Sequence, residues 1–252
     1  MCRRDQTWQS FCLLFLVATS CTAVKEDRSD CPCSLYISLE ALPEEPVDIL
    51  VYAADELCFR DEVDRDTTLL VRVPKRQAVV VGVSGAVPEQ DGSIRIPSGG
   101  DCPPVFLSAQ RVETAQDTAR CRVRLRKQFC TLSLRFDGPP GWGEPYSVRI
   151  RGGVAGLLAD GTPQPGEFSC TLQPGGSCRL PRQRPDGELW LDIAVPEGVL
   201  RSFALGTYLA AAGYDWTAPD LKDSSLRIDL SVTAVRFTIG LWTATVPLEI
   251  VV

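Results

Sequence analysis

The sequence has 252 residues, 44% of them hydrophobic and 23% charged, which is enough apolar material for one large or two medium cores. Its net charge of -6 argues against a nucleic-acid partner, because phosphate binding requires a basic face. The chain contains no histidine, which excludes Ser-His-Asp, Cys-His and histidine-metal sites.

Residues 1–20 have the features of a secretory signal. Arg3 and Arg4 precede the apolar run FCLLFLVA at 11–18, and Thr19-Ser20 follow it. A basic start, a short apolar run and small residues before a break are typical of such a signal. The run is shorter than the ~18–20 residues of a spanning helix, so a retained transmembrane helix is the weaker interpretation. No later run reaches that length, and we expect a soluble body.

Cys21 directly follows Ala18-Thr19-Ser20, and this pattern resembles a bacterial lipobox, although Leu is more usual where Ala18 stands. The resemblance implies a diacylglycerol thioether on Cys21 and a fatty acyl chain on its amino group, with no other cofactor. Two or more chains hold a protein on a membrane far better than one. Lys25, Glu26 and Asp27 resemble the short signal that sends Bacteroidetes lipoproteins to the outer face of the outer membrane. A solvated tether, or a soluble secreted protein cut near the same point, remains open.

Eight cysteines remain after Cys2, Cys12 and Cys21 are set aside, and an even number in an exported chain suggests disulfides. The most local candidate is Cys170 with Cys178, because Pro174-Gly175-Gly176 can reverse two strands between them. A zinc site is the rival interpretation. It is disfavoured because Cys31-Pro32-Cys33 lacks the two-residue gap of a zinc knuckle and no other close pair completes it.

The body alternates apolar and polar residues with a period of two, which predicts half-buried antiparallel strands. The expected strands begin with Leu35, Ile37 and Leu39 on one face. The first half continues at 47–53, 68–73 and 78–83, and the second half has expected strands at 146–150, 167–172, 189–195, 202–209, 226–232, 235–241 and 246–252. Residues 112–119 are expected to form a loop or one helical turn.

A long strand is expected over 121–136, with a bulge at 126–128 where the alternation shifts by one. Residues 137–143, DGPPGWG, form the best domain boundary because Pro and Gly break regular structure. The expected organisation is a signal at 1–20, a lipidated tether at 21–33, and β-sandwiches at 34–138 and 139–252.

Residues 24–33, VKEDRSDCPC, lead into an alternating strand, and residues 213–223 read GYDWTAPDLKD. Both runs resemble the FimB/Mfa-type fimbrial anchor family of Bacteroidetes. Residues 102–106, CPPVF, supply a third run. Smaller pieces are 147–152, Pro181-Arg182-Gln183 and Trp242. These runs follow one another in order along the mature chain.

The resemblance implies an all-β fold of two tandem transthyretin-like β-sandwiches and no enzymatic activity. It also implies an outer-membrane, cell-surface lipoprotein that anchors a fimbria at its base and ends subunit addition. Its partners would be fimbrial shaft subunits, contacted by β-strands. Residues 246–252 are a candidate for that exchange, and an ordinary last strand is the alternative. A surface adhesin or fimbrial tip protein that binds host protein or glycan is the alternative function.

Residues 213–223 also admit other interpretations. Two of the three residues Asp215, Asp220 and Asp223 could supply the carboxylate pair that glycoside hydrolysis needs. Carboxylates in such a run more often cap turns or face water. A calcium site is possible, although the spacing fits no EF-hand. Asp215 beside Trp216 could bind a sugar. The more ordinary interpretation is that Tyr214 and Trp216 pack at a core edge while Asp215 stabilises a turn.

Overall fold

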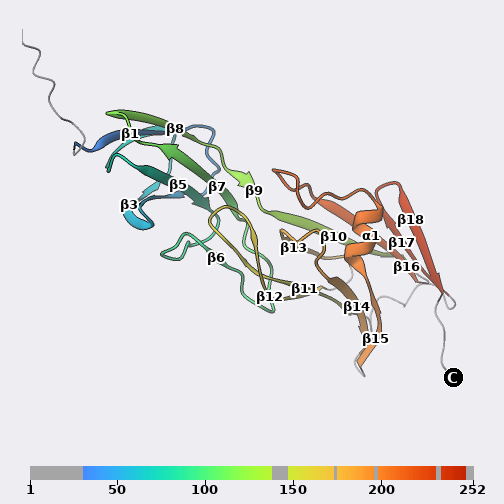
Figure 1. Cartoon of the computed structure of the whole chain (residues 1–252). Helices are drawn as coiled ribbons and strands as arrows, with labels where there is room; N and C mark the ends of the chain where they lie inside the picture. Colours follow the sequence, from blue (N-terminus) through green and yellow to red (C-terminus); the bar gives the residue numbers. More distant parts are fainter. Residues whose placement is uncertain (1–30, 138–146, 173–174, 196–197, 231–233, 248–252) are drawn as a thin grey trace, which may run out of the picture. The chain divides into compact units, whose positions relative to one another are not determined.

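The computed structural model describes residues 31–137, 147–172, 175–195, 198–230 and 234–247, and residues 32–252 form one compact unit. Within the described residues, four β-sheets hold 18 strands and there is one short helix (Figure 1). The expected all-β fold is confirmed. No helix among the described residues is long and apolar enough to cross a membrane.

Two sheets from the first half of the chain face one another across an apolar core. One sheet has the order β4-β1-β8, made by Thr67–Val73, Cys33–Leu39 and Thr118–Val123. The other has the order β3-β2-β5-β7-β9, made by Glu56–Val63, Val47–Ala53, Gln77–Ser84, Phe106–Glu113 and Arg126–Lys127. Leu35 and Ile37 of β1 and Ile49 of β2 belong to the shared core. The alternation in the sequence therefore identified the inward face correctly.

Strand β5 is buried on both faces, which explains its unbroken apolar run AVVVGV. Val80 lies in the core shared with β1, whereas Val81 and Val83 lie in a second core with Ile94 of β6 (Ile94–Arg95) and Cys102. A strand buried on both faces loses the polar positions that otherwise mark its solvent side.

The expected single strand over 121–136 is wrong. Strand β8 ends at Val123, β9 covers Arg126–Lys127 and β10 covers Phe129–Asp137, and the three lie in three different sheets. The shift in alternation at 126–128 marks the passage of the chain from one sheet to the next, which changes the inward face just as a bulge does.

The remaining two sheets hold most strands of the second half of the chain. One has the order β13-β10-β16-β17-β18, in which β13 is Ser177–Pro181, β16 Ser224–Leu230, β17 Ala234–Ile239 and β18 Trp242–Pro247. The other has the order β12-β11-β14-β15, made by Pro163–Leu172, Ser147–Leu157, Leu189–Val195 and Gly198–Phe203, with β6 paired to β11. Leu132, Leu180 and Ile150 are fully buried between them.

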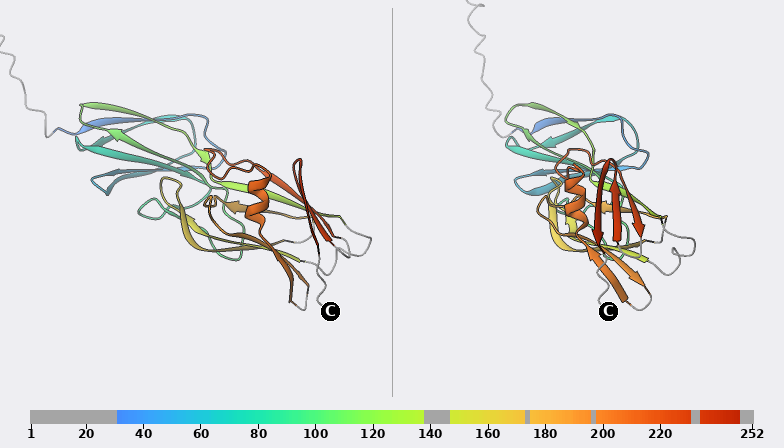
Figure 2. Two further views of the ribbon diagram at one scale, coloured as in Figure 1. Left: turned by 45° about the vertical axis from the view of Figure 1, so that its right-hand side comes forward. Right: turned by 90° about the vertical axis from the view of Figure 1, so that its right-hand side faces the viewer.

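The prediction of a strand at 202–209 is wrong for the second part of that range. Strand β15 ends at Phe203, and helix α1 covers Leu205–Ala211. Leu205 and Leu209 are both fully buried, one helical turn apart on one face. In both views of Figure 2, α1 lies beside β17 and β18, and Tyr208 stacks with Phe237 and Trp242 at centroid distances of 5.0 and 5.6 Å.

The loop expected at 112–119 is shorter, because β7 reaches Glu113 and β8 begins at Thr118. The alternation in the sequence does not predict strands β3, β6, β7 and β13. The division at 138/139 stays a prediction. Strand β10, which precedes it, pairs with β13 and β16 of the later half, so sheet membership already changes before residue 129.

Candidate functional site

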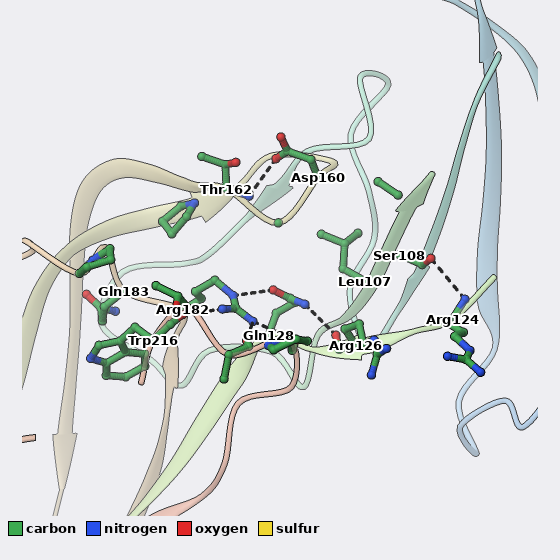
Figure 3. Close-up of a pocket in the computed structure, with 17 residues that line it drawn as sticks. Leu107, Ser108, Arg124, Arg126, Gln128, Asp160, Thr162, Arg182, Gln183 and Trp216 are labelled. Carbon is green, nitrogen blue, oxygen red and sulfur yellow. Dashed lines mark hydrogen bonds between the residues drawn. The ribbon is translucent and has the colours of Figure 1, made fainter. Parts of the chain in front are cut away.

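The described residues form a cavity of about 520 Å³ where β7, the end of β13 and two loops meet (Figure 3). Its wall is mainly polar and carries three arginines. The lining residues are Leu107, Ser108, Ala109, Arg124, Arg126, Gln128, Asp160, Gly161, Thr162, Pro163, Arg182, Gln183, Pro185, Trp216, Thr217, Ala218 and Pro219.

Arg182, directly after β13, organises one side of this cavity. Its Nε donates to Oε1 of Gln128 at 2.8 Å, and Nη2 donates to the carbonyl oxygens of Ala218 and Pro219 at 2.9 and 3.2 Å. Nη1 donates to the carbonyl of Trp216. Figure 3 shows the guanidinium and the Gln128 amide pointing toward one another. Burial lowers the pKa of Arg182 from its ordinary value, and nearby acidic groups oppose that shift. The planar guanidinium thus fixes the loop that carries Trp216.

Two aspartates hold the same loop from outside the cavity. Asp220 pairs with Nη1 of Arg126 at 2.6 Å and accepts from the backbone N–H of Lys127 at 3.0 Å. Asp223 pairs with Nζ of Lys127 at 2.6 Å and accepts from the N–H of Thr131 at 2.7 Å. Burial acts to raise the pKa of each carboxyl, but these donors outweigh it, and both pKa values are lowered.

The structure supports the more ordinary interpretation of residues 213–223, in which Asp215 stabilises a turn and Trp216 packs in the core. Asp215 Oδ1 accepts from the N–H and hydroxyl of Thr217 at 2.8 and 2.6 Å, which is the expected side-chain turn. These two donors from Thr217 lower the pKa of Asp215. Trp216 is buried in the core, and its ring lies 4.6 Å from that of Tyr214. Among the described residues, no group of three or more Cys, Asp and Glu side chains is arranged to hold a metal ion.

The cavity can bind a polar or anionic molecule better than it can catalyse a reaction. Its arginines, amides and hydroxyls are hydrogen-bond groups suited to carboxylates and hydroxyl-rich ligands. Asp160 is the single carboxylate among its lining residues, and it already accepts from the N–H of Thr162 at 2.9 Å. The two-carboxylate arrangement of a glycosidase is therefore not assembled in this cavity.

The sequence pointed to part of this site. The run Pro181-Arg182-Gln183 and the loop 213–223 were both noted for their family resemblance, and the structure brings them together. The sequence did not indicate Gln128 or Arg124 as site residues, because a single polar residue beside a strand has no spacing pattern. The predicted site residues Cys21, Lys25, Glu26 and Asp27 lie outside the described residues.

Cys170 and Cys178 lie in the core and not at the cavity. Their strands β12 and β13 belong to different sheets, and the candidate disulfide between the two cysteines stays a prediction. Cys33, the last residue of the expected tether, is buried as the first residue of β1.

No family model matches the chain, and no curated protein matches it. Solved structures do resemble it. A candidate polysaccharide-binding protein from Bacteroides thetaiotaomicron has a TM-score of 0.65 at 12% identity, over 85% of this chain and 98% of that one. A candidate adhesin from Bacteroides ovatus has a TM-score of 0.64 at 15% identity, over 85% and 95%. The fimbrial anchor protein Mfa2 from Porphyromonas gingivalis has a TM-score of 0.63 at 12% identity, over 84% and 99%. The chain therefore shares its all-β fold with a fimbrial anchor protein, a candidate adhesin and a candidate polysaccharide-binding protein of Bacteroidetes.

Proposed function

We propose that this protein is an outer-membrane lipoprotein that holds a surface fimbria at its base and ends subunit addition. The observation that carries the proposal is a lipobox-like Cys21 that a short predicted tether joins to a body with the fold of a fimbrial anchor. The acyl chains on Cys21 would hold the protein in the membrane, with Lys25, Glu26 and Asp27 as the export signal. The body would contact the shaft subunit.

The contact with the shaft is proposed to use β-strand pairing. Strand β18 lies at the end of its sheet and, within the described residues, pairs only with β17, from Ala234↔Pro247 to Ile239↔Trp242. An end strand has one row of backbone N–H and C=O groups available for a partner strand. Residues 246–247 belong to this last strand, and 248–252 lie outside the described residues.

Two experiments test the proposal. Intact-mass measurement of the mature N-terminus should find acyl chains on Cys21, and Cys21→Ala should release the protein from the membrane fraction. A mature wild-type N-terminus without acyl chains would refute the anchor.

Deletion of the gene should release fimbriae into the medium or alter their length. Deletion mutants whose fimbriae stay cell-bound and of normal length would favour an adhesin instead.

The cavity favours that second candidate, a surface adhesin that binds an acidic or hydroxyl-rich glycan. Arg124 lines the cavity and is exposed, and within the described part of the chain its guanidinium makes no ion pair or hydrogen bond, so it is a natural ligand contact. Arg124→Gln should weaken binding of the purified protein to a glycan array. Arg95→Gln, an exposed arginine outside this cavity, should leave binding unchanged. Equal glycan binding by wild type and Arg124→Gln would count against the cavity as the site.

A further inference from the structure

One face of the sheet β4-β1-β8 is uncovered. The residues on either side of Tyr36 in β1 point into the shared core, so Tyr36 itself points outward. Tyr36 lies opposite Leu70 of β4 and Arg120 of β8. Arg72 of β4 and Arg122 of β8 have the same outward phase in their strands. We call these five exposed residues the basic face, and within it Tyr36 and Leu70 are 38% and 57% exposed.

Two arginines of the basic face have no acidic partner. Within the described part of the chain, the guanidinium groups of Arg72 and Arg120 make no ion pair and no side-chain hydrogen bond. Exposed arginines such as Arg60 and Arg184 differ in this respect, because each pairs with an aspartate, at 3.0 and 3.5 Å. The basic face therefore presents guanidinium donors that an external anion can bind.

The acidic residues that directly flank these three strands are already bound. Glu40, after β1, pairs with Arg122. Asp66, before β4, accepts from two backbone N–H groups at 3.1 and 3.3 Å. Asp117, before β8, pairs with Lys75 at 2.6 Å. The chain has a net charge of -6, but at physiological ionic strength charges more than about 8 Å away are screened, so the positive sign of the basic face governs a contact there.

The chain that follows Cys21 leads into the central strand of this sheet. Strand β1 begins at Cys33, which stands 12 residues after Cys21. A fully extended chain spans at most about 3.6 Å per residue, so the start of β1 lies no more than about 43 Å from an acyl group on Cys21. A short connection of this kind gives the attached sheet a high effective concentration at the membrane, and a weak contact is then sufficient.

We propose that the basic face docks on the phosphate-bearing headgroups of the membrane to which Cys21 is attached. A guanidinium binds a phosphate through two parallel N–H donors, and a tyrosine ring with its polar tip suits the boundary between headgroups and acyl chains. This docking rests on the proposed lipid anchor, which supplies the membrane. Strand β18, the proposed shaft contact, belongs to another sheet and stays available.

The size of the basic face favours a membrane over a protein partner. Three strands of six or seven residues cover about 15 by 20 Å, or roughly 300 Å². A stable protein interface buries about 800 Å² on each partner. Its exposed apolar side chains, Tyr36 and Leu70, are two, whereas the centre of a protein interface is mainly apolar.

Vesicle sedimentation tests the docking without the acyl chains. The mature chain carrying Cys21→Ala keeps the compact unit 32–252. It should sediment with vesicles of phosphatidylcholine mixed with anionic phosphatidylglycerol, and not with vesicles of phosphatidylcholine alone. Salt should release it, because the Debye length falls from about 10 Å at 0.1 M to about 3 Å at 1 M. Equal sedimentation with both kinds of vesicle would overturn the inference.

A double variant identifies the face. Arg72→Gln with Arg120→Gln should lower the affinity for the anionic vesicles by about 20–30-fold, because each arginine near an anionic surface contributes about fivefold. Arg111→Gln with Arg236→Gln is the matched control, since these exposed arginines lie on β7 and β17 and the change of charge is the same. The control should bind like the parent chain. An unchanged affinity of the first variant, or an equal loss in both, would overturn the inference.

Failure of the docking and failure of the anchor are scored separately. Acyl mass on Cys21 together with no preference for anionic vesicles refutes the docking alone. Vesicle binding that depends on Arg72 and Arg120, in a protein whose mature N-terminus lacks acyl chains, supports the basic face and refutes the anchor. Sedimentation velocity covers the remaining occupant. A dimer that the Arg72→Gln, Arg120→Gln variant abolishes would assign the face to a second copy of the chain and overturn the inference.

Discussion

The side chains of Arg182 and Gln128 meet at 2.8 Å, Nε to Oε1, and this contact joins the end of β13 to the residue between β9 and β10. Gln128 is itself fixed, since its Nε2 donates to the carbonyl of Arg126 at 2.9 Å. The backbone repeats the connection, because the N–H of Arg182 donates to the carbonyl of Gln128 at 2.9 Å. The point at which the chain changes sheets is thus the point that supports the cavity.

Arg182→Lys should destabilise the protein by about 1–3 kcal/mol, measured as the free energy of unfolding in urea. Lysine keeps the positive charge, but its single ammonium group cannot hydrogen-bond to Gln128 and three carbonyl oxygens at once, as the planar guanidinium does. Arg184→Lys is the control, because Arg184 pairs with Asp186 at 3.5 Å between exposed side chains. That change should stay within about 0.5 kcal/mol. Equal stability of the two variants would show that Arg182 does not hold the loop.

Asp192 should make stability depend on pH. It is buried and accepts from Arg151 Nε at 2.8 Å and from the Ser202 hydroxyl at 2.6 Å. Burial acts to raise its pKa, but these donors lower it overall. A carboxyl with a lowered folded-state pKa contributes stability above its unfolded pKa of about 3.9, and loses it as the pH falls through the folded-state value.

Asp192→Asn should therefore cost about 1–3 kcal/mol at pH 7, and its deficit relative to wild type should shrink below about pH 4. Urea unfolding at several pH values measures both effects. Asp186→Asn, at an exposed ion pair, should show little deficit at any pH. A deficit for Asp192→Asn that stays constant down to pH 3 would contradict the ionic role.

Gly85→Ala should lower stability by at least about 1–2 kcal/mol. Gly85 has φ of +77°, and an added Cβ would lie 2.1 Å from the carbonyl oxygen of Pro104, which is backbone and cannot rotate away. Gly153→Ala is the control, because nothing lies within 4 Å of a Cβ there. Thermal unfolding should separate the two, and identical Tm values would argue against a close approach of these chain segments.

Leu209→Ala should cost about 2–4 kcal/mol, because it leaves a cavity under α1. Leu209 is 0% exposed, whereas Leu241 is 106% exposed, so Leu241→Ala makes the same chemical change without burial. The control should change the free energy of unfolding by less than about 0.5 kcal/mol. Similar costs for the two variants would mean that α1 does not cover the core in solution.

Hydrophobic alternation alone predicts the all-β class and many of the strands. Alternation reports which side of a strand faces the core, and it placed Leu35, Ile37 and Leu39 correctly. It failed at Leu205–Ala211, because a seven-residue apolar segment fits a strand or a helix, and only packing against β14 and β17 decides between them. It also could not separate a bulge from a change of sheet at 126–128.

Long-range strand pairing and packing, which no local pattern encodes, establish which distant segments meet. Local spacing suggested Cys170 with Cys178, but their position in two facing sheets comes from the pairing of β12 with β11 and of β13 with β10. The parallel pairings of β1 with β8 and of β10 with β16 join strands far apart in sequence, and no local pattern records them. For the same reason the sequence marked Arg182 and Trp216 separately, while the fold placed them in one wall.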